Sequence, residues 1–253
     1  MKKIIVANWK MNPQTPREAK ALALKTKALT TKLEQVSVII CPPALYLPLF
    51  TTARASRQLW WGSQDVSLEA GEGAFTGEIS AAMLAYSGAQ FTIIGHSERR
   101  ARGETDEVVN KKVKLALSAR LKPIICVGES KRDEQGHYLE PLREQIKKAL
   151  TGLDKLSLKK IIFAYEPVWA VGKKAMNADT PAEFQHHAIF IRKTLSDLFD
   201  KKLAMQVPVL YGGSVNSDNA EGFLKEGGAD GLLVGRASLK PEEFKKILYV
   251  ADH

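Results

Sequence analysis

Cysteine and long apolar runs are both scarce in this chain. Of its 253 residues only two, Cys41 and Cys126, are cysteine, and neither belongs to a C-x-x-C pair. A redox pair or a cysteine-based metal site therefore has no support, and we expect two small buried thiols. No apolar run approaches the roughly 18 residues that a membrane span needs. The first apolar run ends at Asn8, too early for the core of a secretory signal, so we expect a cytoplasmic protein.

Nucleotide-binding glycine patterns are missing as well. An open, doubly wound sheet usually shows a G-x-G-x-x-G fingerprint after its first strand, whereas the first apolar run here leads into Asn8-Trp9-Lys10. The glycines within 71–77 lack that spacing, and no G-x-x-x-x-G-K-[ST] element is found. Since there is also no linker or low-complexity segment, residues 1–253 are predicted to form a single domain.

The charge balance is basic but dispersed. The formal net charge is +9 at pH 7, which favours an anionic partner such as nucleic acid, an acidic surface or a phosphorylated metabolite. No nucleic-acid-binding module or basic–aromatic patch is found, so we expect no nucleic-acid function. Most lysines are predicted to lie on solvated helix faces, among them Lys20, Lys25, Lys27, Lys32, Lys111, Lys112 and Lys114.

Apolar runs alternate with helical patterns along the chain. Short runs rich in Val, Ile and aromatic residues begin near Lys3, Val36, Gln58, Gln90, Lys122, Lys160, Val207 and Asp230. The clearest helical stripe comprises Phe184, Ala188, Ile191, Leu195 and Leu198. Thr180 is predicted to cap that helix, with Glu183 completing a capping box. About eight strand–helix pairs in a chain of this length predict an α/β fold, a closed (β/α)8 barrel.

In such a barrel the active site lies at the carboxyl ends of the strands. The polar residues that follow the apolar runs are Asn8, Lys10, His96, Glu98, Glu166, Ser214, Gly235 and Arg236. Taken singly, Lys10 is explained as a solvated loop lysine, His96 as a half-buried histidine and Glu166 as a helix-capping acid. The turns at Ser214 and Gly235 are either plain turns or helix starts whose backbone N–H groups bind a phosphate.

Four segments carry a specific resemblance. They are Asn8-Trp9-Lys10, Gly95-His96-Ser97-Glu98-Arg99-Arg100, Tyr165-Glu166-Pro167-Val168-Trp169-Ala170-Val171-Gly172 and Tyr211-Gly212-Gly213-Ser214-Val215. In this order, spread over the whole chain, they are similar to the signature segments of the triosephosphate isomerase family. The resemblance implies a TIM barrel that interconverts dihydroxyacetone phosphate and D-glyceraldehyde 3-phosphate, with triose phosphates as substrates and with no cofactor and no metal.

The resemblance also implies roles for the predicted catalytic residues. Glu166 matches the base that moves a proton between two carbons through an enediolate, and His96 matches the neutral electrophile that polarises the carbonyl. His96 precedes a predicted helical turn, whose dipole disfavours an imidazolium. Lys10 matches a lysine that supplies positive charge, Asn8 a neighbouring hydrogen-bond donor and Glu98 a supporting carboxylate.

A mobile lid and a homodimer follow from the same resemblance. Pro167 to about Ala175 match the lid, in which Gly172 is expected to bind the phosphate with its N–H. Gly71–Glu78 match a loop that docks into a partner subunit, and Thr76 in this loop is expected to approach the partner's Asn8 and Lys10. No membrane partner is expected.

Two positions depart from the family pattern. Lys173-Lys174-Ala175 stand where the lid hinge usually reads like T-G-K, and Arg236 stands where a glycine is usual. The N–H of Arg236 can still bind phosphate, while its side chain must point away or add a positive charge. Two other functions stay open: another phosphate-binding barrel isomerase, and a non-catalytic barrel that acts as a scaffold.

Overall fold

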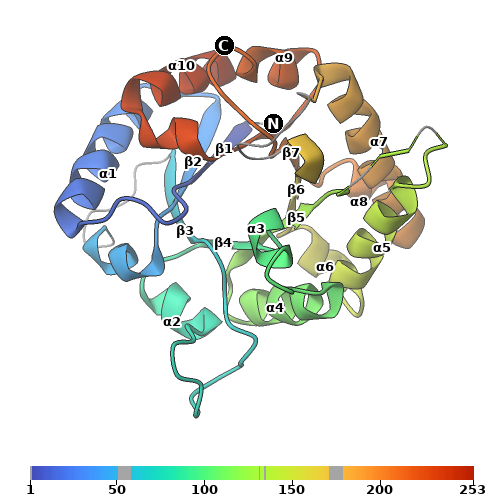
Figure 1. Cartoon of the computed structure of the whole chain (residues 1–253), viewed down its shortest axis with the longest axis horizontal. Helices are drawn as coiled ribbons and strands as arrows, with labels where there is room; N and C mark the ends of the chain where they lie inside the picture. The colour runs from blue at the N-terminus through green and yellow to red at the C-terminus, as the bar shows by residue number, and fades with distance from the viewer. Residues whose placement is uncertain (1, 51–57, 131, 134, 171–178) are drawn as a thin grey trace.

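The computed structural model describes residues 2–50, 58–130, 132–133, 135–170 and 179–253. Eight parallel strands form a closed barrel in which each strand pairs with the next and β8 pairs with β1 (Figure 1). The strands are β1 Lys3–Asn8, β2 Val36–Cys41, β3 Leu59–Ser63, β4 Phe91–Ile94, β5 Lys122–Val127, β6 Ile162–Tyr165, β7 Val209–Tyr211 and β8 Gly231–Val234. The predicted (β/α)8 barrel is confirmed, and every predicted strand start lies within two residues of the observed one.

Helices form the outer ring around the strands (Figure 1). The α-helices are α1 Pro16–Thr30, α2 Ala81–Tyr86, α3 Ser97–Arg100, α4 Asp106–Ser118, α5 Leu139–Leu150, α6 Lys155–Leu158, α7 Pro181–Leu198, α8 Lys201–Ala204, α9 Ala220–Lys225 and α10 Pro241–Asp252. Short 3-10 helices are η1 Ala44–Leu49, η2 Val168–Ala170 and η3 Arg236–Leu239. Within the described ranges, no helix combines the length and apolar character that crossing a membrane requires.

The strands are buried on both faces, which explains their continuously apolar sequences. Ile5 packs in the layer between strands and helices, while its neighbour Val6 packs inside the barrel. This alternation follows from the two-residue period of a strand. Cys41 and Cys126 are free thiols in the barrel interior, as expected for small buried cysteines.

The start of α7 differs in one detail from the prediction. Thr180 caps the helix by accepting a hydrogen bond from the N–H of Glu183 at 3.2 Å, as predicted. The predicted capping box is wrong, because the Glu183 carboxylate instead pairs with Arg132 at 2.9 Å. Leu198 is also not part of the buried stripe, because it ends the helix and is 41% exposed.

Lys112 on α4 is a second correction. We predicted a solvated lysine, but the residue is only 3% exposed. Its ammonium lies 2.6 Å from Asp65 and 3.2 Å from Glu104. A buried cation needs such partners, and nothing in the local helical pattern reveals carboxylates supplied by other segments.

Candidate active site

The strand ends bring a carboxylate and an imidazole into contact. Glu166 follows β6 and His96 lies just beyond β4. Nε2 of His96 lies 3.0 Å from Oε1 of Glu166, and both residues are buried, at 6% and 2% exposed. Glu98, two residues beyond His96, holds the Lys10 ammonium at 2.6 Å. The barrel therefore assembles Lys10, His96, Glu98 and Glu166 at one rim, as the strand-end rule predicted.

The backbone N–H of Ser97 fixes the Glu166 carboxylate from a second side. Oε2 of Glu166 accepts this hydrogen bond at 2.8 Å. Burial raises the pKa of Glu166, but the charge and hydrogen bond of His96, the Ser97 N–H and the charge of Lys10 outweigh it and hold the pKa below its usual range. A Cβ at position 212 would lie 3.0 Å from Glu166 Cγ, so the glycine there leaves room for the Glu166 side chain. The site thus keeps an ionised carboxylate in a tight, buried place.

His96 is held in one orientation by the helix that follows it. It is the N-cap of α3, and its Nδ1 accepts the backbone N–H of Glu98 at 3.2 Å. An accepting Nδ1 carries no proton, so the neutral ring has its proton on Nε2, facing Glu166. Burial lowers the pKa of His96, yet the charge and hydrogen bond of Glu166 win and raise it. The Glu166 carboxylate thus opposes the expected effect of the helix terminus, which disfavours an imidazolium.

Lys10 leaves β1 in an unusual backbone conformation. Its φ is 53°, in the left-handed region that side chains rarely adopt. Two side chains hold the Lys10 backbone in this conformation by hydrogen bonds: Asn8 Oδ1 accepts the Lys10 N–H at 3.0 Å, and Gln64 Nε2 donates to the Lys10 carbonyl at 2.8 Å. Asn8, which we predicted to be a donor near the substrate, is buried and positions Lys10 through its carbonyl oxygen.

A cleft of about 550 Å³ opens beside Lys10 at the ends of β7 and β8. Its lining residues are Lys10, Glu98, Gly213, Ser214, Val215, Asn216, Gly235, Arg236, Ala237, Lys240 and Glu243. A Cβ at position 235 would lie 3.4 Å from Lys10 Cε, an ordinary contact distance, so the lysine stem passes close beside Gly235. Arg236 begins η3, as predicted, but Ser214 does not begin a helix, since α9 starts only at Ala220.

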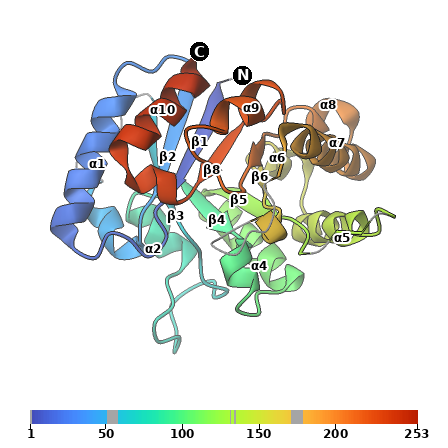
Figure 2. The same cartoon turned by 45° about the horizontal axis from the view of Figure 1, so that its top comes forward.

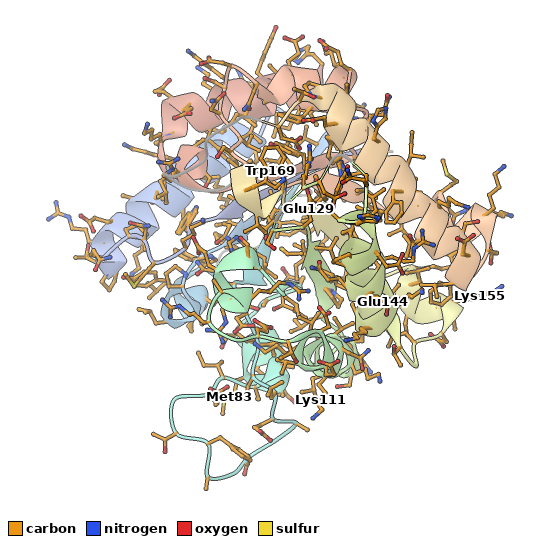
Figure 3. The ribbon with its side chains drawn as sticks, turned by 45° about the vertical axis from the view of Figure 1, so that its right-hand side comes forward. Met83, Lys111, Glu129, Glu144, Lys155 and Trp169 are labelled. Carbon is orange, nitrogen blue, oxygen red and sulfur yellow. The ribbon has the colours of Figure 1, made fainter. Side chains whose placement is uncertain are left out.

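Trp169 lies where the chain enters the predicted lid. Its indole Nε1 donates to Glu129 Oε1 at 2.8 Å, and the two residues lie next to each other in Figure 3. Arg132 covers the Trp169 ring at 4.2 Å and donates to the same Glu129 oxygen at 2.9 Å. Sequence reasoning missed Glu129, although it follows β5 just as Glu166 follows β6.

Gly172 and the hinge segment Lys173-Lys174-Ala175 lie in 171–178, outside the described residues. Across the described part of the chain, no group of three or more His, Cys, Asp or Glu side chains is arranged to hold a metal ion.

Thr76 is not among the residues that line the cleft beside Lys10. It belongs to the loop between β3 and α2, which projects from the barrel in both views (Figures 1 and 2). Thr76 lines a separate cleft of about 420 Å³ together with Arg99 and Arg102. The fold of one chain does not bring Thr76 together with its own Lys10.

Comparisons with known proteins give the family of the chain. A family profile described as triosephosphate isomerase matches residues 3–251. A triosephosphate isomerase from Citrifermentans bemidjiense is 43% identical, over 99% of this chain and 99% of the relative. Proteins of the same name from Caldanaerobacter subterraneus subsp. tengcongensis and Dehalococcoides mccartyi are 43% and 44% identical, over 97% and 98% of this chain and 98% and 96% of the relatives. The chain therefore belongs to the triosephosphate isomerase family.

Proposed function

We propose that this protein interconverts dihydroxyacetone phosphate and D-glyceraldehyde 3-phosphate, with Glu166 as the base and His96 as the electrophile. The observation that carries the proposal is the buried pair itself: a carboxylate and an imidazole 3.0 Å apart, beside the Lys10 ammonium and a cleft with two small-residue turns. The pair can accept one proton and donate another within one substrate molecule.

The proton transfers balance within the substrate. Glu166 releases its bonds to Ser97 and His96 and takes the proton from C1 of dihydroxyacetone phosphate. The C–H electron pair forms the C1–C2 double bond, and the C2 carbonyl oxygen takes up the negative charge. His96 Nε2–H gives its proton to that oxygen, and Nε2 then takes the proton of the C1 hydroxyl. C1=O forms as the double-bond electrons take the proton held by Glu166 to C2, and both side chains regain their starting protonation. Lys10 lowers the energy of the enediolate by its positive charge.

Once Glu166 turns to the substrate, the forces on His96 change. The carboxylate no longer lies against Nε2, so the attraction that raises the His96 pKa weakens. Burial, the Lys10 charge and the donor at Nδ1 all remain and disfavour an imidazolium, and only the charge of Glu98, the smallest of the causes, still favours it. We infer that His96 acts as a neutral hydrogen-bond donor in the reacting complex.

The phosphate is proposed to bind in the cleft at the ends of β7 and β8. Ser214, Gly235 and Arg236 line this cleft, and phosphate sites of this fold are usually built from these two loops. The N–H of Arg236 stands at the start of η3, where unpaired donors favour an anion. Gly172 remains a proposed fourth contact, based on the family resemblance. The phosphate thus anchors the substrate at one end while Glu166 and His96 act at the other.

A homodimer through Gly71–Glu78 is also proposed. The projecting loop and the helix after it expose apolar side chains, which are Phe75, Ile79, Met83 and Tyr86, at 43%, 41%, 53% and 94% exposed. Such a group of exposed apolar residues favours a protein partner. Thr76 in this loop would then supply what one chain lacks, a contact to the partner's Asn8 and Lys10. A cytoplasmic location stays a prediction.

The reaction is tested with Glu166→Gln in a coupled assay on D-glyceraldehyde 3-phosphate, without added metal or cofactor. We expect turnover by the wild type and a loss of at least about a hundredfold in the variant, because the amide cannot accept the proton. Glu221→Gln, an exposed change on α9, is the control. A folded wild type without turnover would support the scaffold, and near-normal turnover by Glu166→Gln would place the base elsewhere.

A further inference from the structure

We propose that the guanidinium of Arg236 gives the phosphate end of the cleft its net positive charge and thereby determines how strongly the enzyme captures phosphorylated substrate. This inference rests on the proposed function and deepens it. It concerns the side chain of Arg236, whereas the proposed phosphate contact uses the backbone N–H.

The position of Arg236 is set by β8 and η3. Arg236 follows Gly235, whose Cα lies against the Lys10 stem: a Cβ built there would be 3.4 Å from Lys10 Cε. Arg236 is itself exposed and lines the cleft together with Ser214. A long, flexible cation therefore starts from the wall of the cleft, next to the catalytic lysine.

The charges lining the cleft do not cancel. Its cations are Lys10, Arg236 and Lys240, and its carboxylates are Glu98 and Glu243. Glu98 pairs with Lys10 at 2.6 Å, and Glu243 pairs with Lys240 at 3.4 Å. Arg236 makes no ion pair with any carboxylate in the described ranges. Two of the three cations are matched by a carboxylate, so the remaining positive charge of the cleft is that of Arg236.

A phosphate monoester responds strongly to this charge. It carries close to two negative charges at neutral pH, and the planar guanidinium fork fits phosphate oxygens better than an amine does. Because the side chain is exposed, its attraction acts mainly while the substrate approaches and binds, and salt screens it. A glycine at this position would leave a cleft of balanced charge.

The test compares Arg236→Gln and Arg236→Lys with a matched control, Arg120→Gln. Arg120 precedes β5, at the opposite end of the barrel, so its loss changes the net charge equally but leaves the cleft intact. We expect Arg236→Gln to lower kcat/KM for D-glyceraldehyde 3-phosphate by roughly threefold to tenfold at low salt, mainly through KM. Arg236→Lys should recover most of this loss, and Arg120→Gln should match the wild type.

Three measurements separate charge from structure. The ionic-strength dependence of kcat/KM should be shallower in Arg236→Gln than in the control. Turnover of D-glyceraldehyde, which has no phosphate, should not fall. Inorganic phosphate should bind Arg236→Gln several-fold more weakly by calorimetry, a reading that does not need turnover. An equal loss with D-glyceraldehyde, or unchanged phosphate binding, overturns the inference, while a wild type that binds phosphate but shows no isomerisation overturns only the proposed function.

Discussion

Glu166 and His96 control each other's protonation. The carboxylate raises the imidazole pKa and the imidazole lowers the carboxyl pKa, because each favours the charged form of the other. Both carboxylate oxygens are occupied, one by His96 and one by the Ser97 N–H. Without substrate, Glu166 is therefore an ionised base whose contacts to His96 and Ser97 must break before it can reach a substrate carbon.

This coupling predicts a change in the titration of His96. In Glu166→Gln the attractive charge is gone, while burial of the ring remains, so the pKa of His96 should fall below that in the wild type. Since protonation is then harder, the ring should stay neutral to lower pH. NMR of the imidazole resonances against pH measures this directly, with the Glu221→Gln protein as control. A His96 pKa equal in wild type and variant would contradict the 3.0 Å contact.

Short elements after the strands position the chemistry. The four residues of α3 present the Ser97 N–H to Glu166 and the Glu98 N–H to His96, so one helical turn orients both partners. Likewise, η3 begins at Arg236 and turns the chain beside Lys10. Longer helices such as α7 contribute packing instead, through the buried Phe184 and Ile191.

At the scale of α7, the Thr180 cap is predicted to matter for stability. Thr180→Ala removes the side-chain acceptor of the Glu183 N–H and should lower the free energy of unfolding by about 1 kcal/mol. Thr180→Ser retains the hydroxyl and should lose much less. Urea unfolding of the three proteins at one protein concentration provides the measurement. Equal midpoints for the alanine and serine variants would show that the cap contributes nothing.

At the scale of the whole molecule, the closed barrel disfavours association through the sheet, whereas exposed apolar side chains favour it. Each strand has two hydrogen-bonded neighbours, so the closed sheet offers no free edge for association. Association must instead use side chains, and Phe75 and Tyr86 lie exposed on the projecting loop and on α2. Like charges at net +9 oppose self-association in general, so any dimer depends on such a local apolar contact.

The dimer is tested with Phe75→Glu. The wild type should sediment at twice the 27.9 kDa chain mass, whereas a buried carboxylate at the interface should shift the variant toward monomer. Activity should fall with the monomer fraction, because Thr76 no longer reaches its partner. Leu156→Glu, on α6 and 65% exposed, is the matched control. A monomeric wild type with full activity, or a dimeric Phe75→Glu protein, would rule out this interface.

Much of the fold and of the site could be predicted from the order of apolar and polar residues along the chain. Parallel strands all point the same way, so polar residues after successive apolar runs must meet at one rim, and Lys10, His96 and Glu166 do so. Glu129 could have been found by the same rule applied to β5. Buried strands and capped helices could be predicted because the spacing of apolar residues and the identity of a capping residue are local properties of the sequence.

Only the tertiary structure decided which partner each polar group has. The burial of Lys112, the pairing of Glu183 with Arg132 and the raised pKa of His96 depend on groups from other segments. Which cation of the cleft has no carboxylate partner likewise depends on Glu98 and Glu243 reaching particular lysines. Residue types and their order determine which chemistry is available, but electrostatic energies fall with distance through space, and those distances exist only after the barrel closes.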